Sequence, residues 1–195
     1  AIPNFQKFQA RSKQSEVKAG LKAAFTAQRA YFQEKDQYSS CVRKIGFVPE
    51  RGNRYKYDFR QTRLTTEAAC STSEVRATAA GTGANTNGII EVDTFKHRGA
   101  TASPTTTVVY TPVQPLNTNI QVSANLVGVF PAAGGSNSSF GVSAAGNIDS
   151  DGLTDLWYVS SVPSTTAGIC PVLTATVGRA SPGEPMNTQN DVNCY

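Results

Sequence analysis

The hydrophobic pattern of the chain changes near residue 37. Before that point, Val17, Leu21, Ala24, Gln28 and Tyr31 follow one another at intervals of four, three, four and three residues. This spacing places them on one face of an α-helix and predicts an amphipathic helix over residues 4–36. We expect its second half to pack on a sheet. The first half has mainly Phe5 and Phe8 among polar residues, so we expect it to project.

After residue 37 the chain is rich in Gly, Thr, Ser, Asn and Pro, with short β-rich runs between them. The candidate strands are Arg54–Arg60, Val75–Ala80, Ile89–Phe95, Thr107–Tyr110, Ile120–Val129, Phe140–Ala144 and Leu156–Ser160. A helix followed by strands, without alternating strand–helix–strand units, predicts an α+β fold. We therefore expect a long N-terminal α-helix packed on an antiparallel β-sheet head.

Length and composition agree with one domain over residues 1–195. The chain has 195 residues, of which 39% are hydrophobic and 16% charged, and its mean hydropathy is −0.30. This composition predicts a soluble globular protein with a substantial core. No stretch approaches the roughly 20 apolar residues that span a bilayer. We divide the domain into a helical stalk over residues 1–36 and a head over residues 37–195.

Charge is distributed unevenly along the chain. Fourteen of the 18 basic residues, but only five of the 14 acidic residues, lie before residue 64. A basic stretch can bind nucleic acid, but no nucleic-acid-binding motif accompanies this one. We favour a dipolar subunit that packs head against tail with its own copies. The basic flank of the helix, from Lys7 to Lys35, would then face acidic positions of neighbouring heads, and the alternative is a solvated helix face.

The four cysteines are Cys41, Cys70, Cys170 and Cys194, and their spacing matches no metal site. An even number in this arrangement favours disulfides over reduced core cysteines. Three connectivities are possible, and the separation into an early and a late pair favours Cys41 with Cys70 and Cys170 with Cys194. Disulfides indicate maturation in an oxidising compartment such as the bacterial periplasm or cell surface.

Residues suited to catalysis are few. The single histidine, His97, lies in the polar run Phe95–Gly99, where a solvated loop histidine is the simpler interpretation. The serine-hydrolase elbow, the zinc-protease motif and the phosphate-binding loop are all missing from the sequence. We therefore predict that the protein is not an enzyme and needs no cofactor, apart from the calcium considered next.

One acidic motif could bind a cation. Asp149, Asp151 and Asp155 surround Gly152 in an oxygen-rich arrangement of the kind that calcium prefers. The motif is not an EF-hand, because Ser160 stands where the bidentate glutamate would be. The alternative is an Asp-Gly β-turn between two strands, in which Asp149 or Asp151 caps backbone amides.

Three segments resemble a known family. The start Ala1–Phe5, the run Arg11–Glu16 and the helix through Ala27–Phe32 resemble the helix of type IVa pilins just after their apolar N-terminal segment. Ile45–Tyr55 resembles the connecting loop of large major pilins from myxobacteria and their deltaproteobacterial relatives. Phe140–Asp149, followed by Asp155–Trp157, is similar to the late hairpin of pilins and pseudopilins. Residues 61–139 match no pattern of the family.

The resemblance implies a lollipop-shaped subunit that assembles into a helical filament, which cytoplasmic motors extend and retract. It further implies a cell-surface fimbrium and a precursor in the bacterial inner membrane with its head in the periplasm. Pilins begin with an apolar segment that this sequence lacks, so we interpret the chain as a truncated ectodomain that is monomeric alone. The C-terminal disulfide loop of the family would correspond to Cys170 with Cys194 and would enclose Ser181–Pro185 as a candidate outer surface.

The implied function is a pilus subunit for surface motility and adhesion. Its partners would be other copies of the chain, the pilus assembly machinery and a surface polysaccharide. The subunit-packing residues that we predict are Phe5, Lys7, Phe8, Arg11, Lys13, Lys18 and Lys22. Two alternatives stay open: a pseudopilin of a type II secretion system, supported by the Asp149–Asp155 loop, and a glycan-binding module in which Tyr110, Trp157 or Tyr158 stack on sugars.

Overall fold

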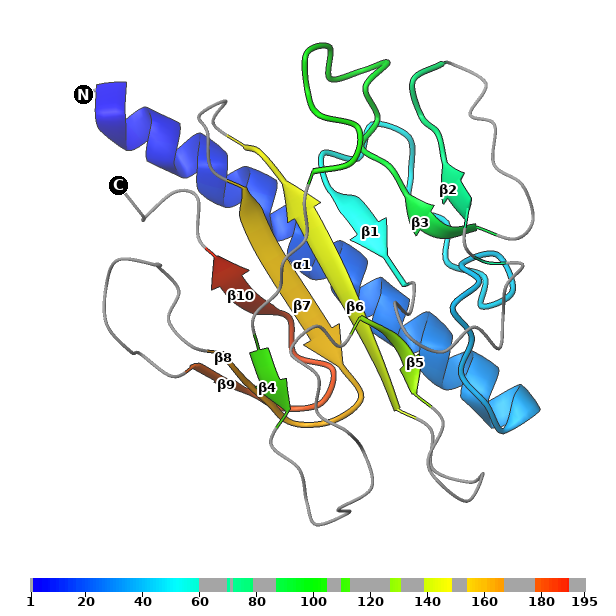
Figure 1. Ribbon diagram of the computed structural model, residues 1–195. Coiled ribbons are helices and arrows are strands. Elements are labelled where there is room, and N and C mark those ends of the chain that lie inside the picture. Colours follow the sequence, from blue (N-terminus) through cyan, green and yellow to red (C-terminus); the bar gives the residue numbers. More distant parts are fainter. Residues whose placement is uncertain are drawn as a thin grey trace.

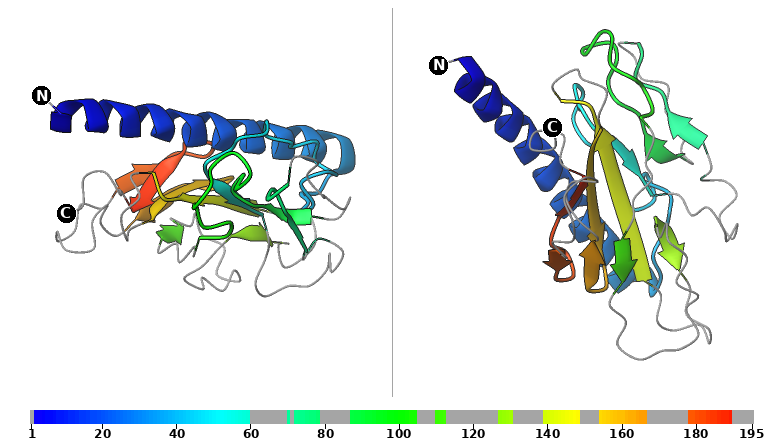
Figure 2. Two further views of the ribbon diagram at one scale, coloured as in Figure 1. Left: turned by 90° about the horizontal axis from the view of Figure 1, so that it is seen from above. Right: turned by 60° about the vertical axis from the view of Figure 1, so that its left-hand side comes forward.

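A long helix crosses one face of a β-sheet in the computed structural model of the protein (Figure 1). The structure describes residues 2–59, 70, 72–78, 87–104, 110–112, 127–130, 139–148, 154–166 and 178–189. Helix α1 (Ile2–Lys35) lies over the sheet, and its N-terminal end extends past the sheet edge (Figure 2). In the described residues, no helix combines the length and the apolar character needed to cross a membrane.

The main sheet has seven strands in the order β10-β7-β6-β1-β3-β2, with β5 paired to β6 beside this path. Its strands are β1 (Lys56–Asp58), β2 (Thr72–Glu74), β3 (Asn87–Ile90), β5 (Gly128–Phe130), β6 (Ser139–Gly146), β7 (Asp155–Ser160) and β10 (Met186–Gln189). All pairs are antiparallel except β2 with β3. A second sheet joins β4 (Tyr110–Pro112), β8 (Ser164–Thr166) and β9 (Gly178–Ala180). The predicted α+β class is therefore confirmed.

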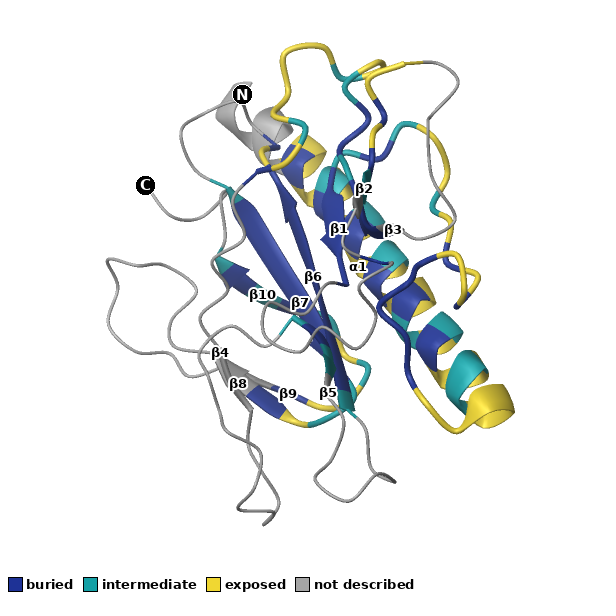
Figure 3. Ribbon diagram, turned by 45° about the vertical axis from the view of Figure 1, so that its right-hand side comes forward, coloured by how far each residue is buried: buried dark blue, intermediate teal, exposed yellow. Residues whose placement is uncertain are grey.

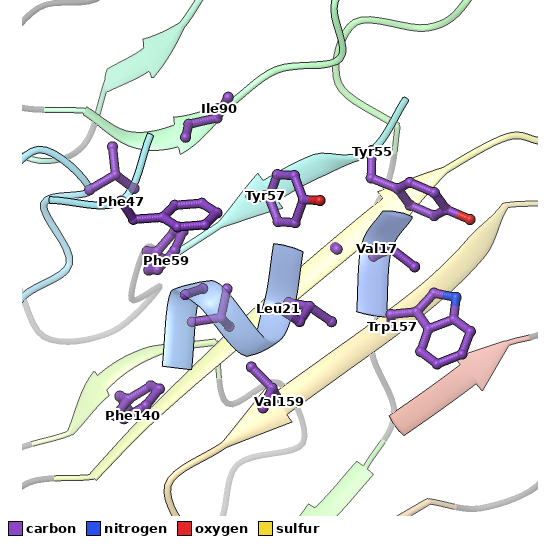
Figure 4. Packing of buried hydrophobic residues seen from close by; sticks show 14 of the residues in the cluster. Val17, Leu21, Phe47, Tyr55, Tyr57, Phe59, Ile90, Phe140, Trp157 and Val159 are labelled. Atoms are coloured by element: carbon purple, nitrogen blue, oxygen red, sulfur yellow. The ribbon is translucent and has the colours of Figure 1, made fainter. Parts of the chain in front are cut away.

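The core lies between α1 and the sheet. Val17, Leu21 and Ala24 of the helix are buried against the strands, and Gln28 continues the same buried stripe (Figure 3). Their partners include Tyr57 of β1, together with Val159 of β7 (Figure 4). Burial of this apolar face stabilises the fold by about 25 cal/mol per Å² removed from water. The predicted helical stripe is confirmed.

The first half of the helix projects less than we expected. Phe8 is 68% exposed, but Ala10 and Gln14 are buried. Among the residues whose side chains the structure describes, contact between α1 and the head therefore begins at Ala10, and Phe8 and Gln9 before it are exposed. The structural reason is that the hairpin of β6 and β7 extends along the helix toward its N-terminal end (Figure 1).

The sheet differs from the predicted strands at several positions. β1, β6 and β7 confirm three of them, and β3 begins two residues earlier than expected and ends at Ile90. The expected strand Val75–Ala80 is wrong, because the strand lies at Thr72–Glu74 and Arg76 leaves it to enter a buried hydrogen-bond network. Residues 107–109 and 120–126 of two other expected strands lie outside the described residues. β8, β9 and β10 were not predicted.

Candidate assembly surface on the helix and the contacts that position it

The residues that we predicted for subunit packing lie along α1. Phe8, Arg11, Lys18 and Lys22 are exposed, and Lys13 is half-buried. Phe5 and Lys7 lie on the same helix, but their side chains are outside the described part of the structure. The helix therefore keeps Phe8 and several cations available to a neighbouring molecule.

Two of these lysines contact the head of their own chain. Lys13 donates a hydrogen bond from Nζ to the Ile148 carbonyl oxygen. The Nζ of Lys18 lies over the Trp157 ring, 5.1 Å from its centroid, at a distance that allows a cation–π interaction. These two side chains help to orient α1 on the sheet, in addition to any contact they make with other copies.

Cations gather on one flank of α1. Arg11, Lys18, Lys22 and Arg29 follow one another at intervals of seven, four and seven residues, which places them on one flank. Glu16 lies on the other flank, where the Arg54 amide donates a hydrogen bond of 2.9 Å to its Oε1. The basic flank lies on the β7 side of the helix, as the position of Lys18 over Trp157 shows.

A buried carboxylate joins the helix to three other parts of the head. Asp155 begins β7 and is fully buried. Its Oδ2 accepts hydrogen bonds from the Tyr55 hydroxyl (2.7 Å) and from Trp157 Nε1 (2.6 Å). Its Oδ1 accepts from Gln14 Nε2 (3.2 Å) and from Asn187 Nδ2 (3.0 Å). Burial, followed by the charge of Asp155, raises the pKa of Tyr55 far above its ordinary value, so this hydroxyl stays protonated and donates.

The calcium interpretation of the acidic motif stays a prediction. Asp149 and Asp151 lie outside the described residues, and Asp155 points its carboxylate at one donor of α1 and three donors of the head. Within the described part of the chain, no cluster of three metal-ligating side chains occurs. Sequence spacing alone did not reveal this role of Asp155, because Gln14, Tyr55 and Asn187 are distant in the chain.

Two of the three aromatic residues proposed for sugar stacking lie in the interior of the protein. Trp157 and Tyr158 are buried, with 5% and 2% of their surface exposed. Trp157 packs in the core under α1, and Tyr158 packs with Met186 and Ala180 on the other face of the sheet. That part of the glycan interpretation is wrong, because α1 covers Trp157 on one face of β7 while Met186 and Ala180 cover Tyr158 on the other. The side chain of Tyr110 lies outside the described residues.

The loop after α1 is fastened at several points. The predicted disulfide Cys41–Cys70 is confirmed, whereas Cys170 and Cys194 lie outside the described residues. Gln28 Nε2 donates to the Ser39 carbonyl oxygen (2.6 Å), so the helix also holds the start of the loop. The predicted solvated His97 is half-buried instead, and its Nε2 lies 2.9 Å from the Gly52 carbonyl oxygen.

Arg76 holds the far end of this loop. Its side chain is 1% exposed, and Nη1 donates to the carbonyl oxygens of Pro49 (3.2 Å) and Glu50 (3.0 Å) and to Asn53 Oδ1 (2.9 Å). Nη2 lies 2.9 Å from the Glu74 carboxylate. Sequence reasoning missed this residue, because a single arginine in a β-rich run gives no signal of burial.

The chain was compared with known proteins. The family model described as type IV pilin PilA matches residues 8–155. The type IV major pilin protein PilA of Myxococcus xanthus (strain DK1622) is 39% identical over 202 residues, a match that covers 100% of this chain and 84% of the relative.

Proposed function

The chain belongs to the type IV pilin PilA family and is a structural subunit of a type IV pilus, and we propose that this pilus serves surface motility and adhesion. The family relation confirms the resemblance seen in the helix, the connecting loop and the late hairpin. Pilins are structural proteins, which agrees with the absence of catalytic motifs from the sequence. The match to a major pilin over the whole chain favours this function over that of a secretion pseudopilin.

The observation that carries the proposal is the geometry of α1. The helix buries one stripe against its own head and leaves Phe8, Arg11 and Lys22 exposed on a second face. Aromatic residues and arginine are enriched at protein interfaces, so this face is suited to packing. We propose that this face packs against other copies, and that many weak contacts repeated along the filament make it strong under tension.

We also propose a location for the precursor and two further partners of the pilus subunit. The pilus lies at the cell surface, and we propose that its precursor is held in the inner membrane with the head in the periplasm. We further propose that the assembly machinery handles this precursor and that the assembled filament contacts surface polysaccharide.

The test uses the cells that produce the protein. Deletion of the gene should remove filaments from sheared surface fractions and abolish spreading on a surface, and the wild-type gene should restore both. Lys22→Glu should lower filament yield, whereas Lys44→Glu, which changes a cation on the loop after the helix, should leave it near normal. Filaments of normal yield and composition in the deletion strain would overturn the proposal.

A further inference from the structure

A surface turn over residues 93–100 presents three side chains outward. Phe95 is 49% exposed, and Lys96 and Arg98 are exposed beside it. Asp93 is buried and His97 is half-buried, so these two side chains support the turn from within. The turn therefore offers a ligand an aromatic ring together with two cations.

The backbone of the turn is held in place by the buried Asp93 carboxylate. Oδ2 accepts hydrogen bonds from the Gly52 amide (2.8 Å) and lies 3.0 Å from Arg51 Nε. Oδ1 accepts from the Lys96 amide (3.1 Å), and the His97 amide donates to the Asp93 carbonyl oxygen (2.9 Å). The outward side chains therefore sit on a preorganised frame, which reduces the entropy lost when they bind.

Neighbouring contacts attach this frame to the rest of the head. The Asp93 amide donates to the Asn53 carbonyl oxygen (3.0 Å), and the Phe95 amide donates to the Arg76 carbonyl oxygen (3.3 Å). The aliphatic part of Lys96 packs over Gly52, so closely that a Cβ there would lie 2.6 Å from Lys96 Cδ. The Lys96 ammonium lies over Gly52 as well, so the side chain of Lys96 joins the turn to loop 49–54.

The surroundings of the turn are basic. Loops 49–54 and 93–100 contain Arg51 and Arg54, whose side chains are 38% and 41% exposed, in addition to Lys96 and Arg98. Within these two loops, both described throughout, Glu50 is the exposed carboxylate and Asp93 is buried. Arg51 pairs with Asp93, and Arg54 Nε lies 4.0 Å from the Glu16 carboxylate, so the charge of this surface comes mainly from Lys96 and Arg98. These two cations favour a ligand with negative charge, because unlike charges attract and guide association.

We propose that the Phe95–Arg98 turn binds an acidic polysaccharide. The Phe95 ring packs against the apolar face of a sugar ring, while Lys96 and Arg98 contact its carboxylate or sulfate groups. The proposal deepens the adhesive role above and rests on it. It names the site and the charge of the ligand, neither of which follows from assembly into a filament.

The size of the surface favours a polymer of repeating units over a protein partner. A stable protein interface buries about 800 Å² on each side, which is far more than one convex turn with three outward side chains offers. One such turn binds a sugar unit weakly. Copies repeated along a pilus bind successive units of one polysaccharide, so the combined affinity exceeds that of a single site by orders of magnitude.

The experiment measures binding of the purified chain to alginate, a polymer of uronic acids. We expect retention on an alginate surface that weakens with salt, and little retention on neutral dextran. Phe95→Ala should lower the affinity about fivefold, the value of one aromatic contact. Lys96→Gln with Arg98→Gln should abolish retention. The matched control, Arg43→Gln with Lys44→Gln, removes two cations from another exposed turn and should bind normally.

Two results would overturn the proposal. One is unchanged alginate binding by both Phe95→Ala and the Lys96/Arg98 variant. The other is equal binding to poly-glutamate with no effect of Phe95→Ala, which would assign the turn to acidic proteins instead. Thermal melting of each variant checks that it is folded. Failure of the pilus role is a separate result, because binding by the isolated chain does not require filaments.

Discussion

Gln14 of α1 donates a hydrogen bond of 3.2 Å to the carboxylate of Asp155, the first residue of β7. Its neighbour Lys13 donates to the Ile148 carbonyl oxygen, on the other side of the turn between β6 and β7. Two consecutive helix residues thus hold both ends of one turn, just after contact with the head begins at Ala10. This relationship anchors the N-terminal half of α1 on the head.

Replacing Asp155 should therefore destabilise the head strongly. Asp155→Ala leaves the buried donors of Gln14, Tyr55, Trp157 and Asn187 without their acceptor. Because each unsatisfied donor costs about 1–3 kcal/mol, we expect the free energy of unfolding in urea to fall by about 3 kcal/mol or more. Gln14→Ala removes one donor and should cost about 1 kcal/mol. Equal losses in the two variants would contradict this account.

Arg76→Ala should loosen the loop over residues 49–54. The substitution leaves the Pro49 and Glu50 carbonyl oxygens without their donor and leaves the buried Glu74 carboxylate without its cation. Removing one partner of a buried ion pair costs about 3–5 kcal/mol. Limited proteolysis should show earlier cleavage in this loop. Arg98→Ala, on the exposed surface, is the control and should leave both stability and cleavage unchanged.

The sequence predicted those parts of the fold that local patterns determine. The stripe of α1 and the long strands β6 and β7 follow from helical spacing and apolar runs. The strands β8, β9 and β10 have three or four residues and polar sequences, so only their pairing partners define them. Such pairing depends on contacts between distant residues, which a local pattern does not contain.

The same limit applies to the functional side chains. The role of Asp155 as a hydrogen-bond acceptor could not be seen in the sequence, because its donors Gln14 and Tyr55 lie 141 and 100 residues away in the chain. Trp157 and Tyr158 look alike as aromatic residues on a strand, yet they face opposite sides of the sheet. The positions of the lysine and arginine side chains on α1 were predictable, because helix geometry alone determines which of them share a face.

Substitution of Gly183 tests whether the turn that contains it packs against Phe25 of α1. Its φ is +81°, and an added Cβ would lie 2.8 Å from the Phe25 ring. Gly46 has a similar φ of +73° but no atom within 4 Å of an added Cβ. Gly46→Ala should therefore cost about 1 kcal/mol from backbone strain alone. Gly183→Ala should cost measurably more in a thermal melt, and equal shifts in melting temperature would contradict the contact.

The Cys41–Cys70 disulfide should contribute substantially to stability. The two residues are 29 positions apart, and closing a loop of that length restricts the unfolded chain by about 3–4 kcal/mol. Cys41→Ser with Cys70→Ser should lower the melting temperature, and reductant should then have less effect on this variant than on the wild type. An unchanged melting temperature in the double variant would show that the bond adds nothing to the folded state.

The pH dependence of stability should include a contribution from Asp93. Burial alone would raise its pKa, but hydrogen bonds from the Lys96 and Gly52 amides, together with Arg51, hold the pKa of this carboxyl below its usual range. The folded state therefore binds the proton less readily than the unfolded chain does. The resulting stabilisation is complete above the ordinary aspartate pKa of about 3.9 and is lost as the pH falls through the lower pKa of the folded state.

Asp93→Asn isolates that contribution, because the amide keeps the shape of the side chain and removes its charge. Near neutral pH the variant should unfold at a lower urea concentration than the wild type, and the difference should shrink as the pH falls below about 4. Glu184→Gln changes an exposed carboxylate and should show no such convergence. A difference between Asp93→Asn and wild type that stays constant from neutral to acidic pH would mean that the charge of Asp93 does not hold the turn. Contacts other than those of the Asp93 carboxylate would then hold the backbone of the turn over residues 93–100.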